Sequence, residues 1–142
     1  MAPRWAMRIV WRVDKLLDRV SGGRIDTRRS MGMSRLFLTT TGRRSGEQRE
    51  VATFFLPVGA GFAVIPSNVG SDKPPAWWLN LQASPEGSVR IGRAIPRPVL
   101  AREATTEEVA ELWPRFVTAY PMYARYSEMT TRHIPIVILE PR

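Results

Sequence analysis

The 142-residue sequence contains no cysteine and a single histidine, His133. Without cysteine the chain has no disulfide, no thiol nucleophile and no thiolate metal ligand. One histidine excludes a histidine-rich metal site, and a Ser/His/Asp triad would have to use His133. The sequence also lacks an apolar run long enough to span a bilayer and lacks a signal-peptide core. We therefore expect a cytoplasmic protein that uses no metal.

Nucleotide-binding fingerprints are also absent. The sequence has no Gly-x-Gly-x-x-Gly, and its most arginine-rich turn, at residues 42–46, does not match the P-loop spacing. With 44% hydrophobic and 24% charged residues, the composition is that of an ordinary globular domain. The sequence therefore gives no support to a Rossmann or P-loop nucleotide site.

Acidic residues are scarce in the first third of the chain. Residues 1–49 hold 12 Lys/Arg against 4 Asp/Glu, whereas residues 50–142 hold 9 of each, so the net charge of +8 is entirely N-terminal. This asymmetry indicates an anionic partner such as a phosphate, an anionic lipid or a nucleic acid. Because no recognition helix or aromatic stacking platform accompanies the arginines, we expect no specific nucleic-acid binding.

Residues 5–20 have the pattern of a basic amphipathic helix, followed by a linker that ends at residue 33. Two interpretations are open. The helix lies on an anionic membrane at its inner face, or it packs on the protein's own core with a solvated basic face. In either case residues 34–142 form the folded domain. The apolar positions are Trp5, Ile9, Val10, Val13, Leu16, Leu17 and Val20.

A strand, a turn and a second strand are predicted over residues 36–56. The turn combines flexible glycines with forked cations and a hydroxyl, which is the chemistry of a phosphate cradle. A solvated basic hairpin tip is the alternative. The residues concerned are Gly42, Arg43, Arg44, Ser45, Gly46 and Arg49.

A second polar loop, residues 67–75, follows a predicted strand at 62–66 and leads into a short helix at 76–83. The start of that helix lies beside Ser67, Asn68 and Lys73, so it is a candidate site for an anion or a carbonyl group. The alternative is a plain connecting loop.

Two further strands are predicted at residues 88–91 and 95–103, with Pro98 indicating that the second lies at a sheet edge. Thr105 and Glu108 form a capping box that opens a helix through Val117, with a bend at Pro114. Residues 134–139 form a continuous apolar strand, as expected for a strand buried in the sheet.

All three tyrosines of the chain, Tyr120, Tyr123 and Tyr126, are spaced three apart. On one helix they would share a face. Phenols beside a cavity can donate a hydrogen bond or a proton to a substrate oxygen while their rings form an apolar wall. A tyrosine-rich packing face is the alternative interpretation.

The order of elements is helix, three strands, helix, two strands, helix, strand. Consecutive strands with helices between them favour an antiparallel barrel with external helices rather than a doubly wound sheet. The predicted fold class is therefore α+β, mainly antiparallel β.

Four stretches together resemble the deazaflavin-dependent nitroreductase family of actinobacteria, whose members use reduced coenzyme F420, an 8-hydroxy-5-deazaflavin. The stretches are residues 38–49, Ser67 with residues 73–81, Tyr120-Pro121-x-Tyr123-x-x-Tyr126, and residues 134–137. The resemblance implies a split β-barrel, of the kind related to flavin-binding barrels, over residues 34–141.

By this resemblance the arginine-rich turn holds the phosphate and polyglutamate tail of the coenzyme, and the second loop and helix start hold its ring. The implied tail site comprises Arg43, Arg44, Ser45, Gly46 and Arg49. The implied ring site comprises Thr53, Phe54, Pro66, Ser67, Asn68, Lys73, Ala76, Trp77, Asn80 and Tyr123. Tyr120 and Tyr126 would surround the acceptor.

The implied reaction is hydride transfer from the reduced coenzyme to a quinone or another activated double bond such as an enone. Ser67, Tyr120, Tyr123 and Tyr126 are the candidate catalytic residues, with Ser67, a tyrosine or solvent as proton donor. Ala52, Phe54, Val69 and Met129 depart from the family pattern, and they fall in the implied acceptor pocket. The alternatives are a non-catalytic carrier of a cofactor, fatty acid or tetrapyrrole, and a flavin-binding split-barrel oxidase or reductase. The sequence leaves the oligomeric state open.

Overall fold

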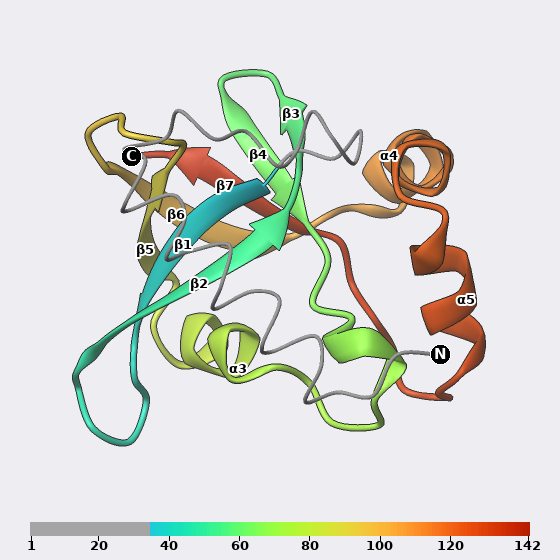
Figure 1. The fold of residues 1–142 in the computed structure, drawn as a ribbon, viewed down its shortest axis with the longest axis horizontal. Helices are drawn as coiled ribbons and strands as arrows, with labels where there is room; N and C mark the ends of the chain where they lie inside the picture. The colour runs from blue at the N-terminus through green and yellow to red at the C-terminus, as the bar shows by residue number, and fades with distance from the viewer. Residues whose placement is uncertain (1–34) are drawn as a thin grey trace.

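The structure is a computed structural model that describes residues 35–142 (Figure 1). The helix expected over residues 5–20 and its linker lie outside the described residues. The described elements, in chain order, are β1 (Arg35–Thr41), β2 (Gln48–Phe54), β3 (Leu56–Val58), β4 (Gly61–Val64), the 3-10 turn η1 (Asn68–Gly70), α3 (Ala76–Ala83), β5 (Glu86–Arg90), β6 (Arg97–Glu103), α4 (Thr106–Ala119), α5 (Met122–Glu128) and β7 (Val137–Pro141).

All seven described strands form one antiparallel sheet in the order β2-β1-β5-β6-β7-β4-β3. The two outermost strands, β2 and β3, are separated in the chain by Phe55 alone. The sheet must therefore curl until its two edges meet at that corner. The curled half-barrel, with helices beside it (Figure 1), confirms the predicted α+β split barrel.

The strands β4 and β7 contribute to two separate apolar clusters, one on each face of the sheet. Val64, Val137 and Leu139 pack with Trp77, Trp78 and Leu81 of α3. On the other face, Leu112 and Phe116 of α4 pack with Ala63, Ile136 and Ile138. Successive side chains of a strand point to opposite faces. Burial on both faces thus explains the continuous apolar sequence that predicted a buried final strand.

The prediction that the strand containing Pro98 lies at a sheet edge is wrong. β6 lies between β5 and β7. Its pairing with β7 begins only at Val99, so Pro98 precedes that ladder, and its carbonyl accepts a hydrogen bond from the Arg142 amide at 3.1 Å. Pro98 is paired with Ser88 of β5, but the N–H and C=O of a strand residue face the same neighbour, so its missing N–H faces the β7 side. A proline is tolerated inside this central strand because that position lies beyond the segment paired with β7.

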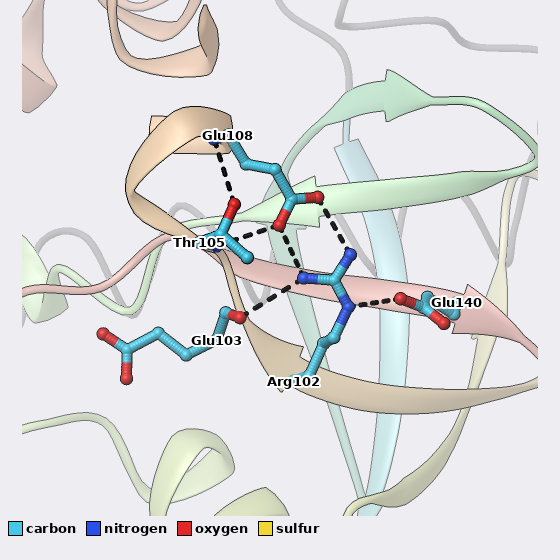
Figure 2. Close-up of polar contacts among 5 residues, drawn as sticks. All are labelled: Arg102, Glu103, Thr105, Glu108 and Glu140. Carbon is cyan, nitrogen blue, oxygen red and sulfur yellow. Dashed lines mark hydrogen bonds and ion pairs between the residues drawn. The ribbon is translucent and has the colours of Figure 1, made fainter. Parts of the chain in front are cut away.

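The start of α4 is fixed to the sheet by the predicted capping box and by Arg102 of β6 (Figure 2). Arg102 donates from Nη1 and Nη2 to the two carboxylate oxygens of Glu108, at 2.6 and 2.9 Å, and from Nε to Glu140 of β7. The hydrogen bonds from Arg102, followed by the backbone bond from Thr105, lower the pKa of Glu108 to about 2. This cluster anchors the helix that leads to α5.

The sequence predicted that the three tyrosines share one helix, and this prediction is wrong. Tyr120 ends α4 with φ −138° and ψ 79°, and α5 begins only at Met122. The cause is Pro121, because a residue that precedes proline is disfavoured in the helical region. Tyr123 and Tyr126 lie on α5, and the Tyr123 ring contacts Tyr120 and Tyr126 edge-on with centroids 5.9 and 6.2 Å apart.

Candidate active site

A cavity of about 590 Å³ lies between the β1–β2 turn, the loop around η1, and helices α3 and α5. This volume is within the range of small-molecule and cofactor sites. The lining residues are Thr40, Gly42, Arg43, Arg44, Ser45, Arg49, Glu50, Val51, Thr53, Phe54, Ile65, Ser67, Asn68, Val69, Lys73, Pro74, Pro75, Ala76, Trp77, Asn80, Met122, Tyr123 and Tyr126.

The β1–β2 turn is tight, and glycine is required within it. The Gly42 amide donates to the Glu47 carbonyl at 2.7 Å and the Gly46 amide to the Gly42 carbonyl at 2.8 Å. A Cβ on Gly42 would lie 2.7 Å from Ser45 Oγ, and Gly46 has φ +74°. The compact turn holds Arg43 and Arg44 at the exposed mouth of the cavity.

Asn80 of α3 ties this turn to the helix. It is 4% exposed, and its Oδ1 accepts from the Arg43 backbone amide at 3.1 Å and from Arg43 Nη1 at 3.4 Å. Its Nδ2 donates to Thr40 Oγ1 at 3.1 Å. Both ends of the Asn80 amide are thus engaged by the protein, and Asn80 holds Arg43 in place.

The mouth of the cavity is cationic. Arg43, Arg44, Arg49 and Lys73 are exposed and contribute to its lining. Arg49 pairs with Glu47 at 3.1 Å, and the two side chains are 61% and 68% exposed. A pair this exposed is weak, so a phosphate or carboxylate of a ligand can replace Glu47 at low cost.

The opposite wall is apolar and carries the tyrosines. Tyr123 is 4% exposed, and burial, followed by the neighbouring Tyr120 and Tyr126, raises its pKa, with a hydrogen bond to Thr53 acting in the opposite direction. Burial also raises the pKa of Tyr126. Both phenols therefore stay protonated at neutral pH and can donate hydrogen bonds.

Five of the residues predicted for the site do not line the cavity: Gly46, Ala52, Pro66, Tyr120 and Met129. The Tyr120 hydroxyl is buried and donates to the Phe55 carbonyl at 2.8 Å, while its ring stacks on Phe54 with centroids 5.0 Å apart. Tyr120 thus supports a lining residue from behind. The other predicted residues all meet in this one cavity.

Sequence reasoning missed several lining residues and one brace. Met122 lies one helical turn before Tyr126 on α5, so the tyrosine spacing could have indicated it. Val51 and Ile65 lie on or beside strands whose facing direction the sequence did not fix. Arg132, in the segment between α5 and β7, donates to carbonyls of the loop before α3, and no pattern pointed to it. The described residues hold no cluster of three or more His, Asp or Glu that could bind a metal.

The half-barrel cavity joins exposed arginines at its mouth to an aromatic wall, which is the donor set of a site for an anionic ligand with a planar ring. The chain belongs to the F420H(2)-dependent quinone reductase family, whose model matches residues 10–141. It is therefore an F420H2-dependent reductase with coenzyme F420 as its cofactor. The resemblance noted in the sequence is confirmed.

Known relatives agree with this assignment. An F420H(2)-dependent quinone reductase of Mycobacterium tuberculosis is 28% identical over 149 residues, covering 98% of this chain and 97% of the relative. Another protein of that organism, also named for this activity, is 35% identical over 107 residues, covering 75% and 89%. A solved F420-H2 dependent reductase is 37% identical with a TM-score of 0.67, covering 75% of this chain and 94% of that one.

The donor set of the cavity fits the chemistry of the coenzyme. A phosphate followed by carboxylates matches the forked donors at the mouth, and a planar ring matches a wall that contains Trp77, Phe54 and the two tyrosines of α5.

Proposed function

We propose that this cavity binds the reduced coenzyme and a quinone together, with the acidic tail at the mouth and the ring against the aromatic wall. When bound, the coenzyme supplies the hydride. The observation that carries the proposal is the junction, in one cavity, of exposed guanidinium groups with the buried Tyr123 and the half-buried Tyr126, both protonated. The protein aligns donor and acceptor and excludes water.

At the mouth, Arg43, Arg44 and Arg49 bind the phosphate and carboxylates of the tail. Each guanidinium can form two parallel hydrogen bonds to such a group. The hydrogen bonds between Asn80 and Arg43 hold this donor in place before the ligand arrives, which lowers the entropy lost on binding.

In the interior, Tyr123 is the proposed hydrogen-bond donor to the acceptor oxygen. It is buried, stays protonated and lines the cavity beside Thr53 and Tyr126. As negative charge develops on that oxygen, the phenol stabilises it and is placed to deliver the proton. Ser67, which is also buried in the lining, is the second candidate donor.

The function is tested by mixing the purified protein with reduced coenzyme and menadione under anaerobic conditions and following the visible absorbance of the oxidised coenzyme. Turnover above the rate without protein is expected. Tight binding without turnover would identify a carrier instead, and a coloured protein on purification would indicate bound flavin. An enone in place of menadione tests the second acceptor class.

The donor assignment is tested by comparing Tyr123→Phe with Ser67→Ala. Loss of a general acid lowers the rate by about 10²–10⁴-fold. We expect this loss in kcat for Tyr123→Phe, with coenzyme affinity little changed. A full rate in Tyr123→Phe together with a large loss in Ser67→Ala would reassign the proton to Ser67.

Peripheral membrane contact through residues 5–20 is a further part of the proposal, supported by the concentration of net charge in residues 1–49. No helix among the described residues is long and apolar enough to cross a membrane. Cosedimentation of the full chain with anionic vesicles, but not with neutral ones, is expected. If the protein sedimented with neither kind of vesicle, the proposed membrane contact would be wrong.

A further inference from the structure

Arg132 reaches from the segment between α5 and β7 to the backbone of the loop that precedes α3. Its Nε donates to the Ser71 carbonyl at 2.8 Å. Its Nη2 donates to the carbonyls of Pro66 and Ser67, at 3.1 and 2.9 Å. One guanidinium thus joins three carbonyls between residues 66 and 71, in the first half of the loop, from a residue more than 60 positions away in the chain.

The loop that Arg132 holds has an unfavourable backbone. Asn68, Val69 and Gly70 have φ values of +46°, +59° and +77° in succession. Positive φ is ordinary for glycine but is a true outlier for a β-branched residue such as Val69. Such strain persists only where the surroundings hold the conformation in place, and it is concentrated at functional sites.

The loop lines the cavity, whereas its brace does not. Ser67, Asn68 and Val69 line the cavity, whereas Arg132 does not. In a trans peptide the carbonyl and the following N–H point in opposite directions. With the Ser67 carbonyl turned toward Arg132, the Asn68 N–H is therefore turned away from Arg132.

We propose that Arg132 is a positioning residue that fixes Ser67 and the Asn68 amide against the coenzyme ring by holding the Pro66, Ser67 and Ser71 carbonyls. The proposal rests on the function proposed above for this cavity. Two further contacts confine the loop: Thr130 Oγ1 to Asp72 Oδ1 at 2.7 Å and Asn68 Nδ2 to the Lys73 carbonyl at 2.9 Å. The Asn68 bond also spans part of the loop, but neither contact holds the Pro66 and Ser67 carbonyls, as the hydrogen bonds of Arg132 do.

The partners of Arg132 are neutral carbonyls, so the brace depends on the forked arrangement of its donors more than on its charge. Partial burial lowers the pKa of Arg132, and Asp72 opposes this shift. A lysine at this position would keep the charge but lack the fixed Nε and Nη2 geometry. Arg132→Lys is therefore expected to replace only part of the brace.

Hydrogen exchange in the ligand-free protein tests the brace directly. The amides of Gly70 and Ser71, which donate to the Ser67 and Asn68 carbonyls, report on the closed loop. In Arg132→Ala we expect their exchange to accelerate by about tenfold or more, with an intermediate effect in Arg132→Lys. Arg115→Ala is the matched control, because Arg115 is exposed and pairs only weakly with Glu111 at 3.7 Å.

Coenzyme titration and kinetics test the positioning role. If the competent loop is populated to about a tenth in Arg132→Ala, the apparent Kd for the coenzyme rises about tenfold. The KM for reduced coenzyme should rise with it, while the KM for menadione changes little. Millimolar guanidinium, but not ammonium, should restore part of the affinity. Where Arg132→Ala fails to fold, Arg132→Lys carries the same comparison.

Unchanged loop exchange and unchanged coenzyme affinity in the variants would overturn the proposal. So would an equal loss for both substrates that guanidinium does not restore, because that indicates general damage. These outcomes are separate from the fate of the proposed function. If the wild-type protein does not oxidise the reduced coenzyme, the function is wrong, and loop exchange still decides whether Arg132 braces the loop.

Discussion

Five of the arginines that the structure describes form two groups that differ in what they bind. Arg102 and Arg132 have several partners within the protein, carboxylates for Arg102 and backbone carbonyls for Arg132. Arg43, Arg44 and Arg49 lie exposed at the cavity mouth. The comparison teaches that one residue type is used for two tasks. The engaged guanidinium groups hold elements of the fold together, and the exposed ones are those proposed here to bind the ligand.

The strongest test of this division removes all three mouth arginines together. Every charge-assisted hydrogen bond that is removed should weaken coenzyme binding by about 1.5–3 kcal/mol, so the triple alanine variant should bind far more weakly in calorimetric titration. The melting temperature should change little because these side chains are exposed. Arg93→Ala is the control, since Arg93 is exposed in the β5–β6 turn and does not line the cavity. Wild-type affinity in the triple variant would place the tail elsewhere.

Asn80 connects the two groups, because it ties a mouth arginine to the frame. Asn80→Ala removes the acceptor for Arg43 and leaves the buried Thr40 hydroxyl without its donor. Leaving a buried polar group unsatisfied costs about 1–3 kcal/mol, which urea unfolding should show. Coenzyme affinity should also fall, by less than in the triple variant. If Asn80→Ala weakened binding with no loss of stability, Asn80 would be a direct ligand contact rather than a clamp.

The contributions of Arg102 and Arg132 to stability should depend differently on pH. The folded-state pKa of Glu108, about 2, lies below its ordinary 4.5, so its contribution to stability is present above about pH 4.5 and is lost as the pH falls toward 2. Glu108→Gln should therefore lower stability at neutral pH, and its unfolding curve should converge with that of the wild type near pH 2. The hydrogen-bond partners of Arg132 are backbone carbonyls, which do not titrate.

Urea unfolding across this pH range measures the effect, with Glu107→Gln as the control in the same helical turn. Parallel stability profiles for wild type and Glu108→Gln would show that the carboxylate of Glu108 contributes nothing through Arg102.

Local sequence patterns predicted the parts of the fold that depend on local physics. The capping box at Thr105, the helix after Pro75 and the apolar final strand are all present. The errors concern strand positions, which depend on the neighbouring strands in the sheet and not on the local sequence. Pro98 is tolerated in the central strand β6 because the pairing of β6 with β7 begins only at Val99. The sequence also did not predict the three-residue strand β3, which follows Phe55.

The candidate site shows the same limit. The exposed cations and the loop beside α3 were predicted from residue type, and the structure brings them into one cavity. Tyr120 was assigned to the acceptor, but Pro121 ends the helix and the hydroxyl of Tyr120 bonds to the Phe55 carbonyl. Arg132 could not be found, because its partners are backbone carbonyls, and every residue has one.

The smallest expected effect concerns Glu47, whose carboxylate pairs with Arg49. Both side chains are largely exposed, so Glu47→Gln should change the free energy of unfolding by at most about 1 kcal/mol. It removes a negative charge that competes with the ligand for Arg49, so coenzyme affinity should rise slightly, and the gain should shrink as salt screens the mouth. Titration at two salt concentrations measures this. Weaker binding in Glu47→Gln would mean that Glu47 orients Arg49 for the ligand, which would move Arg49 from the exposed group to the engaged one.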